Sequence, residues 1–216
     1  MKIKITSDST SDLSPQQLAR HDIALIPLYI NIGDKCLRDG LEVGPDDVYA
    51  HVDAGGELCS TAAVNVADYA ERFTALRREY DAVIHVDISA DFSSCYQNAV
   101  LAAQDLDNVY VVDSRNLSTG HGHVVLRAAE LAEQGMDAPA IVDALNALAP
   151  KVDASFILSR LDYMKKGGRC SSVVALGANL LKLRPCIEVV DGKMQVGKKY
   201  RGSFDKCVDQ YVRERL

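Results

Sequence analysis

Hydroxyl side chains gather in three clusters along this sequence, each directly after an apolar segment of the kind that forms a buried β-strand. Serine and threonine hydroxyls donate hydrogen bonds, so they suit a carboxylate or phosphate ligand. Because ligands bind beyond the carboxyl ends of the strands in open parallel sheets, we expect the clusters to converge at one sheet edge. The clusters are Ser7–Ser9, Ser89–Ser94 and residues 113–122.

Helix starts at the same edge would strengthen an anion site, since the first N–H groups of a helix are free and carry the positive end of its dipole. For any single serine, capping a helix is the simpler interpretation. The convergence of three clusters nevertheless favours a site. The candidate ligand-binding residues in these clusters are Ser93, Ser94, Ser118, Thr119 and Gly120.

A further candidate, Arg169, follows the pair Gly167-Gly168, which allows close backbone approach or a positive φ. The guanidinium could hold an anionic group in bidentate fashion. A structural ion pair between two domains is an equally good interpretation of the same residue.

Several common site motifs are missing from the sequence. Gly120-His121-Gly122 lacks the third glycine of the dinucleotide fingerprint, and there is neither a nucleoside-triphosphate loop nor a GxSxG elbow. His121 and His123 would not share a helix face and are expected to flank a helix start, and no carboxylate or cysteine completes a metal set at the usual spacing. We therefore predict no metal, no cofactor and no catalytic residue.

Two other classes of function remain as alternatives. Asp8, placed after an apolar strand, could act as a phosphatase-like nucleophile, but Thr10 stands where such chemistry needs a second acid. An enzyme acting on a small anionic substrate, in the manner of a phosphotransferase, would need a base near Ser93, with Asp8 or His121 as candidates. The other alternative is a regulatory sensor that binds a lipid and docks a partner.

Composition and charge narrow the partners and the compartment. The formal net charge of −6 argues against nucleic acid and anionic membrane as main partners. No apolar run approaches the ~20 residues that cross a bilayer, and the first residues lack the apolar core of a secretion signal. We thus expect a cytoplasmic protein without membrane insertion, whose six scattered cysteines are free thiols.

Short apolar strands alternate with amphipathic helices over most of the chain, which predicts a Rossmann-like α/β domain with a parallel sheet covered on both faces. The pattern changes after Pro150, so we expect one domain over residues 1–152 and a smaller α/β domain over residues 153–216. The expected strands are 2–6, 23–32 with Pro27 at an edge or bulge, 82–88, 109–112, 154–158, and 186–190 joined to 193–199 by a hairpin turn at Asp191-Gly192. The expected helices are 15–20, 45–52, 66–80, 94–106, 122–134, 138–148, 172–181 and 204–216.

Five motifs, taken in their order and spacing, resemble the DegV family of bacterial proteins. The resemblance spans essentially the whole chain, and its specificity comes from the set because each motif alone is weak. The motifs are Ser7–Leu13, Thr61–Asn65, Ile88–Ala99, Asp113-Ser114 with Ser118–Gly122, and Leu161–Arg169 continuing to residues 181–185.

The resemblance implies a two-domain α/β fold with a long-chain fatty acid buried between the domains, its head group on the first domain. In the relatives, hydroxyls that match Thr61 and Ser93 hold the lipid carboxylate. Some relatives present the bound acid to the catalytic subunit of a fatty acid kinase, which makes an acyl phosphate. By this resemblance the chain is a carrier, and the chemistry belongs to its partner.

Two departures from the family pattern bear on the site. Ala62 stands where the relatives usually have serine, so one hydroxyl donor is missing. The relatives typically run tens of residues further, with a tail that completes the second domain and carries a histidine near the lipid head, whereas this chain stops at Leu216. We therefore expect an incomplete second domain, with dimer formation, marginal stability or an open lipid tunnel.

Overall fold

The structure of the chain is a computed structural model that describes residues 1–175 and 183–215. Contacts within the chain divide it into two compact units, Met1–Val152 and Asp153–Leu216. None of the helices in the described residues is long and apolar enough to cross a membrane.

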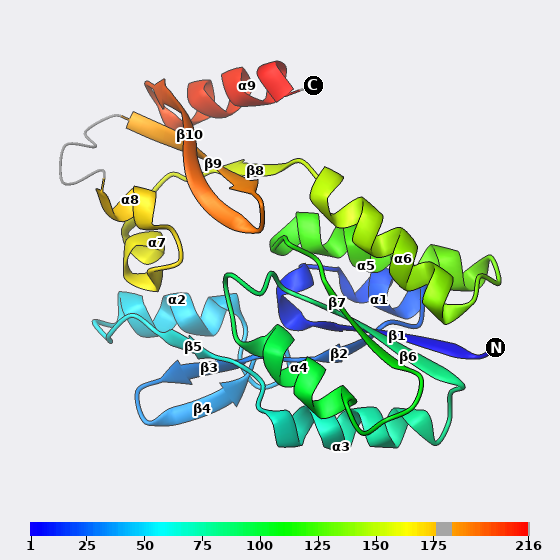
Figure 1. Cartoon of the computed structure of the whole chain (residues 1–216). Helices are drawn as coiled ribbons and strands as arrows, with labels where there is room; N and C mark the ends of the chain where they lie inside the picture. Colours follow the sequence, from blue (N-terminus) through cyan, green and yellow to red (C-terminus); the bar gives the residue numbers. More distant parts are fainter. Residues whose placement is uncertain (176–182, 216) are drawn as a thin grey trace. The chain divides into compact units, whose positions relative to one another are not determined.

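The first unit is built on a four-stranded parallel sheet, which confirms the predicted α/β class (Figure 1). Its two central strands, β1 (Ile3–Asp8) and β6 (Ala82–Asp87), are almost entirely buried, as expected for strands covered on both faces. Strand β1 pairs with β6 in a register that sets Thr6 opposite His85, a pairing that matters for the site below. The strands, in the order in which they lie side by side, are β2 (Ala24–Ile26), β1 (Ile3–Asp8), β6 (Ala82–Asp87) and β7 (Val109–Asp113).

Helices cover both faces of this sheet (Figure 1). On one face, α5 and α6 bury Val124, Val125 and Ile141 against the strands. On the other face, Tyr69 and Phe73 of α3 are fully buried. The sheet helices are α1 (Pro15–Arg20), α3 (Val66–Arg77), α4 (Cys95–Ala103), α5 (Ser118–Glu133) and α6 (Ala138–Leu148), with 3-10 turns η1 (Ser9–Ser11) and η2 (Ala149–Lys151).

Several helices of the first unit begin after a polar residue that caps them. Ser14 accepts the backbone N–H of Gln17, whose side chain in turn accepts from Ser14, so α1 begins with a complete capping box and Pro15 at its first position. Asn65 and Asp137 cap α3 and α6 in the same manner, each accepting a backbone N–H three residues on.

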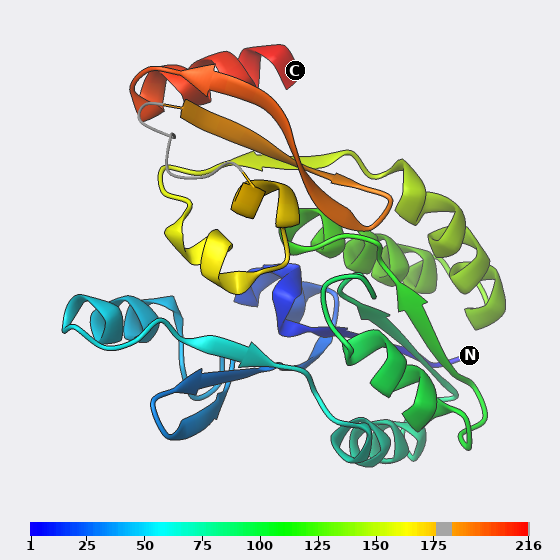
Figure 2. The ribbon, with the colours of Figure 1, turned by 60° about the vertical axis from the view of Figure 1, so that its left-hand side comes forward.

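The expectation of a single strand over residues 23–32 is wrong. The segment breaks at Pro27: β2 ends at Ile26, and β3 (Tyr29–Ile32) joins a different sheet. Proline lacks an N–H and fixes its φ, so it cannot continue the ladder of a parallel sheet. The second sheet is antiparallel, in the order β4 (Lys35–Arg38), β3 and β5 (Ser60–Ala62), with helix α2 (Pro45–Asp53) between β4 and β5 in the chain (Figure 2).

The second unit is a three-stranded antiparallel sheet in the order β10-β9-β8, with helices. The turn between β9 and β10 has positive φ at both Asp191 (51°) and Gly192 (80°), as a two-residue hairpin of type I′ requires. The expected helix 172–181 is described as far as Ala175, and its remainder lies outside the described residues. The elements are β8 (Ala154–Ile157), α7 (Asp162–Gly167), α8 (Ser171–Ala175), β9 (Leu183–Val190), β10 (Lys193–Arg201) and α9 (Phe204–Arg215).

Candidate functional site

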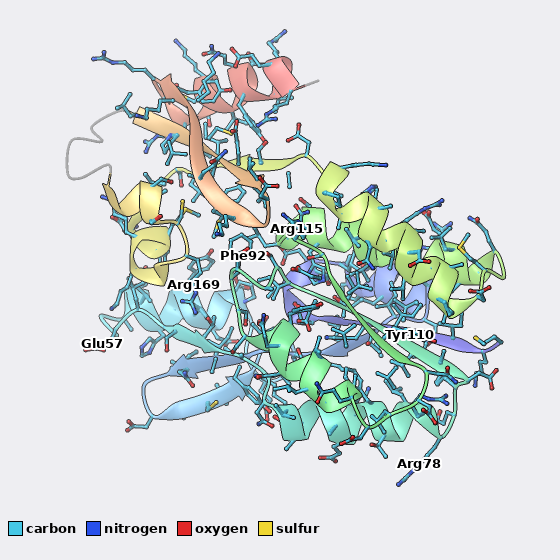
Figure 3. All side chains as sticks on the ribbon, in the orientation of Figure 1. Glu57, Arg78, Phe92, Tyr110, Arg115 and Arg169 are labelled. Carbon is cyan, nitrogen blue, oxygen red and sulfur yellow. The ribbon has the colours of Figure 1, made fainter. Side chains whose placement is uncertain are left out.

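Backbone hydrogen bonds join the loops that follow β6 and β7 at the carboxyl edge of the parallel sheet. Ser89 N–H donates to the carbonyl of Asn116 over 2.9 Å, and Ala90 N–H donates to an Asp113 carboxylate oxygen over 3.3 Å. Figure 3 marks the two loops by the labels of Phe92 and Arg115. The second and third hydroxyl clusters are therefore neighbours in the fold.

The loop after β1 is tied to both of the others. The Asp8 carboxylate accepts the Ile88 N–H at 2.6 Å, which links it to the loop after β6. The Ser118 hydroxyl donates to Asp12, which links it to the start of α5. All three hydroxyl clusters thus lie at one edge of the first unit, where the sequence places them.

Ser93 is a half-buried hydroxyl of this edge, and its contacts leave it able to turn toward a ligand. It accepts the Cys95 N–H at 3.2 Å and donates to the Cys95 sulfur at 3.1 Å. Burial raises the pKa of the Cys95 thiol to about 11, so the sulfur is neutral and a weak acceptor. A carboxylate oxygen would be a stronger acceptor for the Ser93 proton. Ser94 beside it is exposed and precedes α4 without forming a side-chain cap.

Ser118, Thr119 and Gly120 form the first turn of α5, which has no side-chain cap at Leu117. Only Thr119 of the three is exposed; Ser118 is half-buried with its hydroxyl committed to Asp12, and Gly120 is buried. The free N–H groups of this turn and the Thr119 hydroxyl are the groups that could meet an anion.

The predicted helix start at Gly122 is wrong, because α5 begins at Ser118 and the histidines lie inside it. His121 is fully buried and His123 is exposed. The first turn starts from an unusual backbone: Ser118 has a φ of 51°, and Asp12 and Arg115 beside it have φ values of 52° and 54°. Such left-handed residues are costly unless they are glycine, and they often mark sites where loop geometry is constrained.

Thr61 is exposed on β5, where it pairs with Ile30 of β3. The segment that follows it is attached to the first turns of α4, because the Asn98 side-chain amide donates to the Val64 carbonyl over 2.7 Å. Helix α4 thus holds the segment after Thr61, and the helix itself begins two residues after Ser93.

Arg169 belongs to the second unit, between α7 and α8. It is exposed, and its guanidinium donates to the Gly167 carbonyl over 2.6 Å. Gly168 ends α7 with a φ of 72°, so the double glycine serves a left-handed helix end.

Beneath the loops lies a buried cluster in which Asp8 and His121, the two candidate bases, meet His85 and Asp87, which the sequence analysis did not single out; all four side chains have no exposed surface. Burial would raise the pKa of Asp8, but His121, Thr10 and the Ile88 N–H together hold it below its usual value. Burial raises the pKa of Asp87 to about 7. The sequence signal was present, since His85 and Asp87 are polar residues on one face of an otherwise apolar strand.

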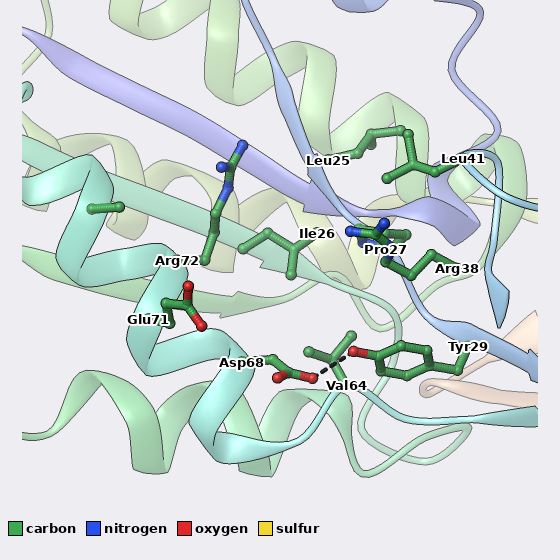
Figure 4. Close-up of a pocket in the computed structure, with 11 residues that line it drawn as sticks. Leu25, Ile26, Pro27, Tyr29, Arg38, Leu41, Val64, Asp68, Glu71 and Arg72 are labelled. Carbon is green, nitrogen blue, oxygen red and sulfur yellow. Dashed lines mark hydrogen bonds between the residues drawn. The ribbon is translucent and has the colours of Figure 1, made fainter. Parts of the chain in front are cut away.

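A separate cavity of about 330 Å³ opens in the first unit between β2, β3 and α3 (Figure 4). Apolar side chains such as Leu25, Ile26 and Val64 line it together with charged ones. On its wall the Tyr29 hydroxyl donates to Asp68 over 2.6 Å. None of the candidate residues lines this cavity, and within the described ranges no group of three or more histidine, cysteine or acidic side chains could hold a metal ion.

The fold defines an α/β protein with a parallel sheet and a polar carboxyl edge, and comparison with known proteins identifies the family. The model of the DegV family (uncharacterised protein, DegV family) matches residues 2–212, so the chain belongs to the DegV family. A DegV domain-containing protein of Deinococcus radiodurans is 34% identical over 97% of this chain and 75% of its own length.

Solved structures share the fold over nearly the whole chain. A fatty-acid-binding DegV family protein of Thermus thermophilus has a TM-score of 0.86 and 30% identity, covering 99% of this chain and 78% of the relative. A stearic-acid-binding protein of Eubacterium ventriosum has a TM-score of 0.84 and 26% identity, again over 99% and 78% of the two chains.

Proposed function

We propose that this chain binds a long-chain fatty acid by its carboxylate, with Ser93 and Thr61 as hydroxyl donors. The observation that carries the proposal is the edge of the parallel sheet, where a half-buried Ser93 hydroxyl faces only a weak acceptor and α5 begins without a side-chain cap. The fatty-acid-binding relatives with the same fold support this ligand class. Ser94, Thr119, Gly120 and Arg169 are proposed as further contacts, and Ser118 as the residue that holds the start of α5.

The tail supplies the affinity and the head group sets the position. Burying about 14 methylenes at ~0.8 kcal/mol each contributes on the order of 11 kcal/mol, and association and ordering costs remove much of this gain. A carboxylate taken out of water without hydrogen-bond donors would offset the rest. Hydroxyl and helix N–H donors are therefore the part of the site that decides where the lipid lies.

The finer part of the proposal is that the chain carries the bound acid to a separate kinase subunit, in the cytoplasm. The two side chains that could have served as a base near Ser93 are both fully buried: Asp8 binds Thr10 and Ile88, and His121 binds Ser7 and the Val86 carbonyl. Chemistry on the carboxylate would then fall to the partner. Incubating the lipid-loaded chain with ATP, with and without a fatty acid kinase catalytic subunit, and trapping acyl phosphate with hydroxylamine tests this: product without the subunit would refute the carrier role.

The test of fatty-acid binding is calorimetric titration of the delipidated protein with palmitate. Removing one hydroxyl that donates to a charged acceptor costs about 1.5–3 kcal/mol, so Ser93→Ala should weaken binding roughly 10- to 100-fold. Thr61→Ala should have a similar or milder effect. Ser60→Ala is the matched control, because Ser60 precedes Thr61 on β5 and its side chain points to the opposite face.

Two outcomes would refute the proposal. Equal palmitate affinity in wild type and Ser93→Ala would remove Ser93 from the site. Failure of the folded wild type to bind any C12–C18 acid would refute fatty acids as the ligand class.

The ligand control is hexadecanol. Because it lacks the carboxylate, it should bind wild type and Ser93→Ala equally weakly.

A further inference from the structure

Four ionisable side chains are fully buried beneath the loops of the candidate site, and the proposed function leaves them unused. They are Asp8 at the end of β1, His85 and Asp87 on β6, and His121 in α5. Buried charges are expensive unless hydrogen bonds satisfy them, so a cluster of this kind needs a reason.

The Asp8 carboxylate is the centre of the cluster. One oxygen accepts the N–H and the hydroxyl of Thr10, at 2.7 and 2.6 Å, and the other accepts the Ile88 N–H at 2.6 Å. Asp87 is its neighbour on the adjacent strand, because Ser7 pairs with Val86 and the two acids follow at the next position, and each acid affects the pKa of the other. One carboxylate therefore joins the loop after β1 to the first residue of the loop that carries Ser93.

A hydrogen bond between two carboxyl groups requires one of them to be protonated, since a carboxylate has no hydrogen to donate. Asp87 is the better site for the proton. Asp8 receives three donors from Thr10 and Ile88, all of which stabilise its charge. Burial raises the pKa of Asp87 to about 7, although His85 opposes the rise.

Two histidines lie beside the pair of acids. His85 lies between the Thr6 hydroxyl at 2.8 Å and an Asp87 oxygen at 3.2 Å. Burial lowers the pKa of His121, which makes the ring neutral near pH 7 despite Asp8 at 3.9 Å.

The remaining ionisable groups near the pair come from three elements. The Tyr69 hydroxyl of α3 donates to Asp87 over 3.4 Å, and burial raises the pKa of that phenol. Cys95 of α4 is a neutral thiol, because burial raises its pKa too. Asp12, which follows η1, carries a negative charge that opposes the lowering of the His121 pKa. Among these groups, burial brings the pKa of Asp87 close to neutral pH.

We propose that the proton shared by Asp8 and Asp87 holds the Ile88–Ser94 loop where Ser93 can meet a fatty-acid carboxylate. The inference rests on the proposed function. The carbonyl of Asp87 also accepts the Ser114 N–H over 3.0 Å, so the pair anchors the loops after both β6 and β7. Loss of the proton breaks the hydrogen bond between the two acids and sets two buried negative charges against each other, which pushes β1 and β6 apart where the loop begins.

Binding should accordingly weaken in alkaline solution. A single linked proton lowers palmitate affinity by at most about tenfold for each pH unit above the pKa of Asp87. Asp87→Asn removes this dependence, because the amide resembles the protonated acid and can donate to Asp8 at every pH. Asp105→Asn makes the same change at an exposed position and should keep the wild-type profile.

The first experiment is palmitate titration from pH 6 to pH 9 with wild type, Asp87→Asn and Asp105→Asn. Because the three proteins meet the same ligand, their differences are free of the ligand's own ionisation. We expect wild type and Asp105→Asn to lose affinity above pH 7 while Asp87→Asn stays level. An equally steep loss in Asp87→Asn would overturn the inference.

The second measurement needs neither a variant nor a lipid. The Ile88 amide donates directly to Asp8, so its protection from hydrogen exchange in the lipid-free wild type should fall above pH 7. Unchanged protection from pH 6 to pH 9 would overturn the inference even if palmitate binds. Reduced protection in a protein that binds no fatty acid would support the acid pair as the anchor of the loop and refute only the proposed ligand.

Discussion

Gly122 in α5 offers a direct test of how closely this helix is held against the loop after β1. Inside a helix, glycine to alanine normally stabilises by about 1 kcal/mol. A Cβ at Gly122, however, would lie well inside van der Waals contact of the Ser11 carbonyl oxygen and 3.1 Å from the Leu13 side chain. The first neighbour is backbone, which cannot rotate away, so the helix or the loop must move.

Overpacking of this kind costs about 1–3 kcal/mol, and the upper half of that range applies where backbone is met. After the gain in helix propensity, Gly122→Ala should destabilise the protein by about 1–2 kcal/mol. The shift of the first turn of α5, Ser118–Gly120, should weaken palmitate binding as well.

The assay is urea unfolding, followed by circular dichroism, of wild type, Gly122→Ala and Gly167→Ala. Gly167 is the matched control because it is helical and a Cβ there would meet nothing within 4 Å. We expect the control to be as stable as wild type or more so. If Gly122→Ala also matched or exceeded wild type, the close approach of α5 to Ser11 would be wrong.

Three further predictions concern other parts of the molecule. The proton on Asp87 contributes to the free energy of unfolding. This contribution is complete below pH 3.8, the pKa of Asp87 in the unfolded chain, and it is lost as the pH rises to about 7, the pKa of Asp87 in the folded protein. A pKa raised by this amount corresponds to on the order of 4 kcal/mol. Asp87→Asn should therefore show a flatter stability curve between pH 4 and pH 7 than wild type, and parallel curves would contradict the raised pKa. Thiol titration of the denatured, unreduced protein should count six thiols, and a count of four or fewer would reveal a disulfide. Tyr29→Phe removes the 2.6 Å hydrogen bond to Asp68 and should cost about 1 kcal/mol in unfolding experiments, because Asp68 keeps its bond to the Asn65 amide; a cost near zero would show that water replaces the phenol.

The parallel core was predictable because its elements depend on local patterns. The strand at residues 82–88 is apolar apart from His85 and Asp87, and helix α6 spans Ala138–Leu148 as expected. The polar loops at the sheet edge follow from the same logic, because parallel strands must all end on one side.

The second sheet of the first unit was missed because its strands are too short to show alternation. Strand β4 is Lys-Cys-Leu-Arg and β5 is Ser-Thr-Ala, and neither has a pattern that separates it from a loop. Only the pairing of both with β3 makes them strands. Tertiary context decides such cases, because strand propensity is weak compared with pairing.

The acid pair escaped prediction for a different reason. Asp8 and Asp87 are 79 residues apart, and they meet only because β1 and β6 pair with Thr6 opposite His85. A shift of one residue in that register would turn each side chain to the other face of the sheet. The register is a product of packing on both faces, which the sequence of either strand alone does not contain.

The pair of Asp8 and Asp87 also shows why polar residues are needed at the centre of this sheet edge. Replacing a buried ionic group by apolar side chains is often neutral or stabilising, provided that no backbone group loses its partner. Here the Asp8 carboxylate accepts the N–H groups of Thr10 and Ile88, which lie where the strands end and the ladder can no longer satisfy them. An apolar residue at position 8 would leave both donors unpaired. The carboxylate is thus the group that lets two loops leave the sheet side by side, and the position of Ser93, the proposed carboxylate donor, depends on where those loops lie.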